Sequence, residues 1–117
     1  MQRFMLKSKI HRVTVTGAEL DYEGSISIDE KLMEAADLLP YEKVNIYNVS
    51  NGERFSTYVI KGRKNSGVIC LNGAAARKAS RGDIIIIASY VVVDDEAARK
   101  WAAKCVYVDK ENKIKKK

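Results

Sequence analysis

The chain has little of the side-chain chemistry on which metal enzymes depend. Its 117 residues include one histidine, His11, and two cysteines, Cys70 and Cys105, which lie far apart in the sequence. Protein zinc sites need several Cys and His ligands together, so this set cannot form one. The only tight group of carboxylates, Asp94–Glu96, is typical of a helix N-terminus. We therefore expect no metal.

Glycine-rich phosphate-binding loops are also missing. The stretch "NGAAARK" contains one glycine, whereas the dinucleotide fingerprint needs three at fixed spacing. No Cys–His or Ser–His pair stands in a known local catalytic motif, and His11 taken alone is more typical of a structural imidazole. The common nucleotide-binding and hydrolase motifs are therefore excluded.

Long hydrophobic runs are absent as well. No apolar run approaches the roughly 18 residues that a membrane-spanning helix needs. The N-terminus "MQRFMLKSKIHR" is basic but has no apolar signal-peptide core. We expect a cytoplasmic protein with no membrane partner. No Gly/Ser-rich linker divides the sequence, so residues 1–117 are expected to form a single domain.

The positive charge is concentrated at the C-terminus. The net charge is +6, of which residues 110–117, "KENKIKKK", contribute +4. We interpret this segment as a basic, flexible tail, with a binding arm as the alternative. The remaining chain is nearly balanced, and its predicted strands do not interleave basic and aromatic residues. A nucleic-acid partner is therefore not expected.

Hydrophobic periodicity predicts a mainly β protein with short helices. Asp29 is the expected N-cap of a helix that begins at Glu30, buries Leu32, Ala35, Ala36 and Leu39 and ends before Pro40. Asn51-Gly52 predicts a hairpin, and the apolar run 84–93 predicts a strand buried on both faces. The expected strands are 12–16, 18–24, 25–28, 44–49, 53–60, 68–73, 84–93 and 105–108.

The middle of the chain contains a loose internal repeat. A strand, a helix, a turn and a strand occupy "SISIDEKLMEAADLLPYEKVNIYNV", and the same order recurs in "GVICLNGAAARKASRGDIIIIASY". Two such halves can close into a small β-barrel with short helices at its mouths.

The junction Gly24-Ser25 in "DYEGSISIDE" has two interpretations. The first is a turn in which glycine adopts positive φ. The second is self-cleavage, because Ser25 Oγ can attack the Gly24 carbonyl carbon to give an ester. Elimination from that ester leaves dehydroalanine, and hydrolysis turns dehydroalanine into a pyruvoyl group. The dipeptide alone does not decide between these interpretations.

Four ordered blocks favour self-cleavage. The segments "LKSKIHRVTVT", "YEGSISIDE", "NGERFSTYVI" and "GVICLNGAAARK" resemble the pyruvoyl-dependent aspartate 1-decarboxylases over about residues 1–95. The resemblance implies a double-psi β-barrel and a homotetramer. It implies a proenzyme, or zymogen, that cleaves itself into a beta chain, residues 1–24, and an alpha chain, residues 25–117. It also implies decarboxylation of L-aspartate at its α-carboxylate to β-alanine and CO2, for pantothenate biosynthesis.

The resemblance also assigns roles to residues. Ser25 becomes the pyruvoyl group that forms a Schiff base with the substrate amine, Tyr58 resembles the proton donor, and Thr57 resembles the residue that assists cleavage at Gly24 and contacts substrate. Lys9 and Arg54 resemble the carboxylate-binding cations, and we leave open which carboxylate each one takes. The matching binding stretch is Asn72, Gly73, Ala74 and Ala75, with Tyr22 and His11 as possible lining residues.

Each of these residues also has an interpretation without function. Tyr58 alone is a packed aromatic, Arg54 a solvated charge, and "AAARK" a helical turn. Thr57 and Tyr58 are neighbours on one predicted strand, so a regular ladder turns them to opposite faces. Contact of both with one site requires a bulge or a site built from two subunits. The alternative functions are a basic nucleic-acid-binding barrel and an inert structural barrel.

Overall fold

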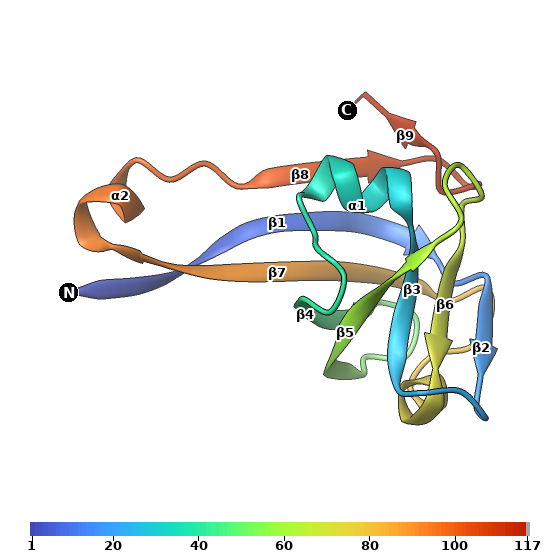
Figure 1. Ribbon diagram of the computed structural model, residues 1–117. Helices are drawn as coiled ribbons and strands as arrows, with labels where there is room; N and C mark the ends of the chain where they lie inside the picture. Colours follow the sequence, from blue (N-terminus) through green and yellow to red (C-terminus); the bar gives the residue numbers. More distant parts are fainter. Residues whose placement is uncertain (117) are drawn as a thin grey trace.

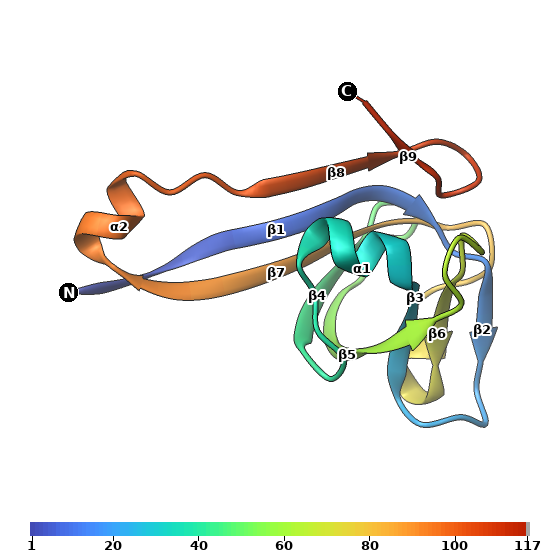
Figure 2. The ribbon, with the colours of Figure 1, turned by 45° about the horizontal axis from the view of Figure 1, so that its top comes forward.

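The computed structural model describes residues 1–116 and confirms a mainly β protein. Figures 1 and 2 show a compact barrel body from which the paired strands β1 and β7 extend as a long arm toward the N-terminus. The strands are β1 (Gln2–Thr14), β2 (Gly17–Glu19), β3 (Ser25–Asp29), β4 (Lys43–Asn48), β5 (Arg54–Gly62), β6 (Ile69–Asn72), β7 (Ile84–Asp94), β8 (Lys104–Val108) and β9 (Ile114–Lys115). The helices are α1 (Glu30–Ala36), the 3-10 helix η1 (Gly73–Arg77) and α2 (Asp95–Arg99).

The N-terminal segment closes the barrel. The strand order is β2-β6-β3-β5-β4-β7-β1-β8-β9. β1 pairs with β7, whereas β2, which follows it directly in the chain, pairs with β6 at the other end of this series. One segment thus joins both ends of the sheet around a core of β-branched and leucine side chains. The largest fully buried members are Ile10, Ile26, Ile28, Leu32, Ile46, Ile69, Leu71, Ile85 and Ile87.

The predicted internal repeat is present. β3, α1 and β4 form the first unit, and β6, η1 and β7 form the second. The Asn51-Gly52 hairpin is confirmed, because β4 and β5 pair antiparallel across it and Gly52 has φ +82°. Asp29 caps α1 as predicted, since its Oδ1 accepts the Lys31 N–H at 2.9 Å.

Helix α1 is shorter than the periodicity predicted. Asp37 is its C-cap and adopts φ +55°, so the chain leaves the helix before Leu39. Leu39 is consequently 67% exposed, and Leu38 enters the core in its place. The apolar run in β7 is also only partly as predicted. Its barrel half, Ile85 to Ser89, is largely buried, whereas Tyr90 and Val92 on the arm are exposed.

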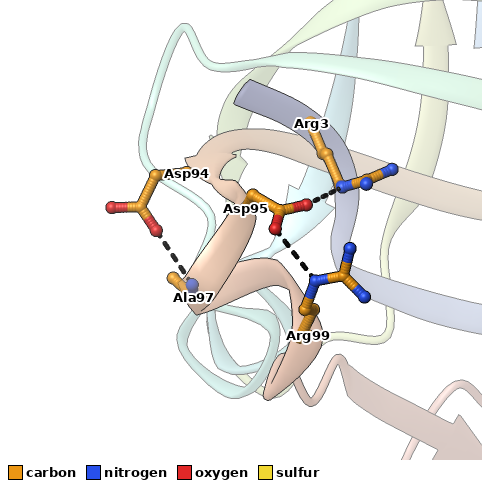
Figure 3. A network of polar contacts seen from close by, with 5 residues as sticks. All are labelled: Arg3, Asp94, Asp95, Ala97 and Arg99. Carbon is orange, nitrogen blue, oxygen red and sulfur yellow. Dashed lines mark hydrogen bonds and ion pairs between the residues drawn. The ribbon is translucent and has the colours of Figure 1, made fainter. Parts of the chain in front are cut away.

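The arm consists of the outer halves of β1 and β7 and is fastened at its tip by α2 (Figure 3). Asp94 caps α2 by accepting the Ala97 N–H at 2.8 Å, as the acidic triplet predicted. Asp95 accepts hydrogen bonds from Arg3 at 2.6 Å and Arg99 at 2.9 Å. These bonds, from Arg99 and then from Arg3, lower the pKa of Asp95. The tip of the arm therefore connects the N-terminus to α2.

Residues 110–115 do not form the flexible tail that their composition predicted. They turn back through Asn112 into β9, which pairs with β8. The Asn112 side chain is 2% exposed; its Nδ2 donates to the carbonyls of Thr14 and Gly67, each at 2.8 Å, and its Oδ1 accepts the Thr14 N–H. These long-range bonds outweigh the repulsion among the lysines. Lys117, the end of the predicted tail, lies outside the described residues.

Candidate functional site

An open pocket of about 410 Å³ brings together several residues on which the predicted function depends. Gly24, Thr57, Tyr58, Ala74 and Ala75 line it. They come from the β2–β3 connection, from β5 and from η1. Gly24 carries the carbonyl that the self-cleavage hypothesis places under attack, so the junction and the two hydroxyl-bearing residues share one pocket.

Thr57 and Tyr58 reach the same pocket without a bulge. The register of β5 with β4 is regular from Arg54 to Tyr58. β3 joins the other side of β5 only from Val59 onward. Residues 54–58 therefore have one edge without a strand partner within the described chain. The pocket lies along this edge and not over one face of the sheet. Neighbouring side chains that point to opposite faces of β5 can therefore both line it. The sequence analysis did not foresee this arrangement.

Ser25 lies immediately beyond Gly24, at the start of β3, and is fully buried. Its Oγ donates a hydrogen bond to the Glu23 carbonyl at 3.1 Å. The same Oγ accepts from Asn72 Nδ2 at 3.0 Å. Asn72 is 2% exposed and stands opposite Ser25 in the antiparallel β3–β6 pair. The hydroxyl is thus adjacent to the Gly24 carbonyl and held by an amide from the predicted binding stretch.

Gly73, not Gly24, is the glycine that the local backbone requires. Gly73 has φ +61°, and a Cβ there would lie 2.5 Å from the Tyr22 carbonyl oxygen and 2.6 Å from Gly24 N. A Cβ on Gly24 would meet nothing nearer than Ala74 N at 3.9 Å, and its φ is not positive. The positive φ that the turn interpretation predicted for Gly24 is therefore wrong, although the chain does bend at this residue. The β6–η1 corner presses against the junction because Gly73 has no side chain.

The predicted cations do not line this pocket in one chain. Lys9 belongs to β1 and is separated from β5 by β4 and β7. Ser56 pairs with Asn45, Asn45 with Ala88, and Ala88 with Lys9, so three strand spacings lie between Ser56 and Lys9. At about 4.8 Å each, the spacings separate Ser56 and Lys9 by roughly 14 Å. Arg54 stands at the start of β5 and places its guanidinium 4.0 Å from the centre of the Tyr47 ring.

The two possible lining residues are also elsewhere. His11 lines a separate pocket with Tyr107, Asp109 and Lys110. Tyr22 is 58% exposed, and only its carbonyl approaches Gly73. Within a single chain, therefore, Lys9, Arg54, His11 and the Tyr22 ring are not gathered around Gly24.

Three pocket residues were missed by the sequence analysis. Phe55 and Ser56 line the pocket because they share the open edge of β5 with Thr57. Lys78 follows η1 and brings the one cation among the described lining residues. Its Nζ pairs with Glu53 Oε2 at 3.2 Å, and its carbonyl accepts from Asn48 and Asn51. The sequence "AAARK" indicated that Lys78 ends a helical turn, but it did not indicate that Lys78 lines the pocket.

Among residues 1–116, no three His, Cys, Asp or Glu side chains gather closely enough to hold a metal ion. None of the helices found in the same range has the length and apolar character needed to cross a membrane.

The fold and the pocket define a small β-barrel protein whose Gly-Ser junction faces an open, hydroxyl-lined site. The family model described as aspartate decarboxylase matches residues 1–115, so the chain belongs to that family. The aspartate 1-decarboxylase of Syntrophus aciditrophicus (strain SB) is 74% identical over 98% of this chain and 99% of its own length. That of Thermoanaerobacter pseudethanolicus (strain ATCC 33223 / 39E) is 59% identical over 97% of both chains.

Proposed function

We propose that this protein decarboxylates L-aspartate at its α-carboxylate, giving β-alanine and CO2 for pantothenate biosynthesis in the cytoplasm. The observation that carries the proposal is the shared pocket of Gly24, Thr57 and Tyr58, with the buried Ser25 hydroxyl next to the Gly24 carbonyl. Relatives up to 74% identical bear the name aspartate 1-decarboxylase and support the assignment.

The site first has to be made by the chain itself. Ser25 Oγ attacks the Gly24 carbonyl carbon while its proton passes to the Ser25 nitrogen, and the C–N bond breaks to leave an ester. Loss of the Ser25 Cα proton and cleavage of the Cβ–Oγ bond release Gly24 as a carboxylate. The remaining dehydroalanine takes up one water and releases ammonia, which leaves a keto group at residue 25. No external oxidant or reductant is needed.

The residues around Ser25 fit a pyruvoyl group. Asn72 Nδ2 lies 3.0 Å from Ser25 Oγ in the uncut chain, and the same N–H donor can serve the ketone oxygen that forms on the neighbouring Cα of residue 25. Gly73 keeps the opposing backbone close. Once formed, the pyruvoyl group supplies a ketone electrophile for the substrate amine and an electron sink for loss of CO2.

The other pocket residues have roles that follow from their chemistry. Thr57 carries a hydroxyl that can donate to the Gly24 carbonyl oxygen as negative charge develops there. The Tyr58 phenol can return a proton to the substrate carbon after CO2 has left. Ala74 and Ala75 are small and leave room for substrate beside the junction.

A second chain would supply the cations that bind the substrate carboxylates. Lys9 and Arg54 lie outside the pocket of their own chain, so a site that uses them together with Ser25 needs a neighbouring subunit. The arm offers a surface for a second copy, because Phe4 is 81% exposed and lines another open pocket with Tyr90 and Val92. Self-association into a homotetramer fits both features.

Intact-mass measurement of the purified protein tests the function. We expect two fragments, residues 1–24 and 25–117, whose summed mass differs from that of the chain by one added water and one lost ammonia. Active protein should convert aspartate to β-alanine. A single unbroken polypeptide without turnover would contradict the proposal and favour the inert barrel. Salt-sensitive binding of an oligonucleotide by that unbroken chain would favour the nucleic-acid alternative.

A further inference from the structure

Four polar side chains share one face of the β3–β6 pair, and we call them the β3–β6 polar patch: Ser25, Ser27, Cys70 and Asn72. In the antiparallel register Ser25 stands opposite Asn72, and Ser27 stands opposite Cys70. Since residues two apart on a strand point to the same face, the register places all four together. The sequence analysis gave neither Cys70 nor Ser27 a functional role.

The Asn72 carboxamide is bonded on every side within this patch. Its Nδ2 donates to Ser25 Oγ and to Ser27 Oγ, each at 3.0 Å, which uses both N–H groups. Its Oδ1 accepts from Cys70 Sγ at 3.4 Å. The carboxamide therefore has one partner for each donor and one for its acceptor.

The remaining hydrogen bonds fix which way the carboxamide faces. Ser25 Oγ uses its proton on the Glu23 carbonyl, so it can only accept from Asn72. The atom of Asn72 that faces Ser25 must then be Nδ2, and Oδ1 is left facing Cys70. Burial, followed by the charge of Glu19, raises the pKa of the Cys70 thiol, so the thiol stays protonated and can donate.

We propose that Cys70 and Ser27 are positioning residues for self-cleavage, acting through Asn72 to hold the Ser25 hydroxyl beside the Gly24 carbonyl. The proposal rests on the proposed function. Without the Cys70 donor, the carboxamide loses one of the contacts that favour its orientation, and the population with Nδ2 on Ser25 falls. Neither residue needs to touch the reacting bond.

Cys70→Ala tests the proposal by removing the thiol donor, and Cys70→Ser tests whether a hydroxyl donor restores the cleavage rate. A neutral hydrogen bond contributes modestly, so we expect Cys70→Ala to slow cleavage about two- to tenfold. Cys70→Ser keeps a donor in a smaller group and should cleave within about twofold of wild type. Cys105→Ala is the matched control, because Cys105 is exposed on β8, and it should cleave at the wild-type rate.

Cleavage is measured by a short pulse of cell-free translation followed by a chase, with uncut and cut chains separated on a gel. Thermal unfolding of each purified variant reports whether it folds. If Cys70→Ala does not fold, Ser27→Ala tests the other side of the carboxamide and should also slow cleavage.

Each outcome is decisive. The positioning role is supported if folded Cys70→Ala cleaves slowly and Cys70→Ser has a rate close to that of wild type. If Cys70→Ala is unfolded, slow cleavage of Ser27→Ala supports the role instead. Cleavage at the wild-type rate in folded Cys70→Ala would overturn that role. Equal slowing in Cys70→Ala and Cys70→Ser would overturn it too. If Cys70→Ala is unfolded, cleavage of Ser27→Ala at the wild-type rate would overturn it. If the positioning role is overturned in one of these ways while the wild-type chain still cleaves, the proposed function stands. A wild-type chain that never cleaves would instead contradict the proposed function.

Discussion

Gly73 and Gly24 face each other across the junction, but only one of them is needed by the fold. The Gly73 conformation, φ +61°, is unfavourable for any residue with a Cβ, and the space beside it is filled by backbone. Gly24 has room for a methyl group. The same substitution should therefore destabilise the fold at Gly73 and leave it unchanged at Gly24.

We predict that Gly73→Ala lowers the free energy of unfolding by on the order of 2 kcal/mol or more, because the added Cβ strains φ and meets the Tyr22 carbonyl. The displaced junction should also cleave more slowly. Gly24→Ala should fold with wild-type stability. Urea unfolding and intact mass measure both effects. Equal stabilities of the two variants would show that the close approach at Gly73 is unimportant.

A second prediction at this scale concerns Lys78. Its ion pair with Glu53 is half-exposed, at 47% and 44%, so the pair is weak and an acidic substrate can compete with it. Glu53→Gln should free Lys78 and lower KM for aspartate by up to about fivefold. Glu96→Gln, which loses a similar exposed pair in α2, is the control. An unchanged KM in Glu53→Gln would separate Lys78 from substrate binding.

At the scale of elements, Asp29 joins α1 to the β5–β6 loop. Its carboxylate is 2% exposed and accepts N–H groups of Lys31, Asn65 and Gly67 at 2.8 to 2.9 Å. Burial raises the pKa of Asp29, but the bonds from Gly67, Lys31 and Asn65 outweigh it, and the net shift is downward. The ionised form is thus the one the fold stabilises.

This shift predicts the direction of a pH effect. A carboxyl whose pKa is lower in the folded state stabilises the fold above its unfolded pKa of about 3.9. That contribution is lost as pH falls through the folded pKa. Asp29→Asn should cost roughly 2–3 kcal/mol at pH 7 and flatten the acid side of the stability curve. Urea unfolding between pH 7 and pH 2 measures this, and identical curves would exclude the role.

Local signals predicted the elements that local chemistry controls. The Asp29 cap and the Asn51-Gly52 hairpin follow from neighbouring residues and were found as predicted. Residues 2–11 of β1 were not predicted as a strand, because their basic residues interrupt the apolar alternation and only pairing with β7 makes them a strand. Residues 110–115 were misjudged for the same reason, since Asn112 finds its partners about a hundred and about fifty residues away.

The site was predictable in its parts but not in its arrangement. Family motifs pointed to Gly24, Thr57, Tyr58 and Ala74, and these lie together. The separation of Lys9 from them depends on strand order and register, which no local pattern encodes. Cys70 and Ser27 lie inside the family motifs without a role assigned to them there, and only the β3–β6 pairing reveals their contact with Asn72.

At the scale of the whole molecule, the distance between Lys9 and the pocket predicts that chains share sites. Ser25→Ala cannot form the proposed keto group, and Lys9→Ala lacks the cation that we propose binds substrate, so each variant alone should be inactive or nearly so. In tetramers assembled from equal amounts of both, about one quarter of two-chain sites receive Ser25 from one chain and Lys9 from the other.

Co-expression of the two variants should therefore restore roughly a quarter of wild-type turnover per site. Light scattering should report a particle of about four times 13.1 kDa. Mixing after separate purification is the control, because chains that have already assembled can share sites only if the assembly first dissociates. Failure of co-expression to restore turnover, with the particle intact, would place both residues in the site of one chain.

The position of β1 has a last consequence. β1 lies between β7 and β8, and β2 is paired with β6. After a break at residue 24, the short N-terminal fragment therefore stays hydrogen-bonded to strands of the long fragment. Folding of the precursor is unimolecular, but reassembly of the mature pair is bimolecular. After heating, the barrel of the cleaved protein should thus refold at a rate that rises with concentration, whereas the barrel of an uncut Ser25→Ala chain should refold at a rate independent of dilution.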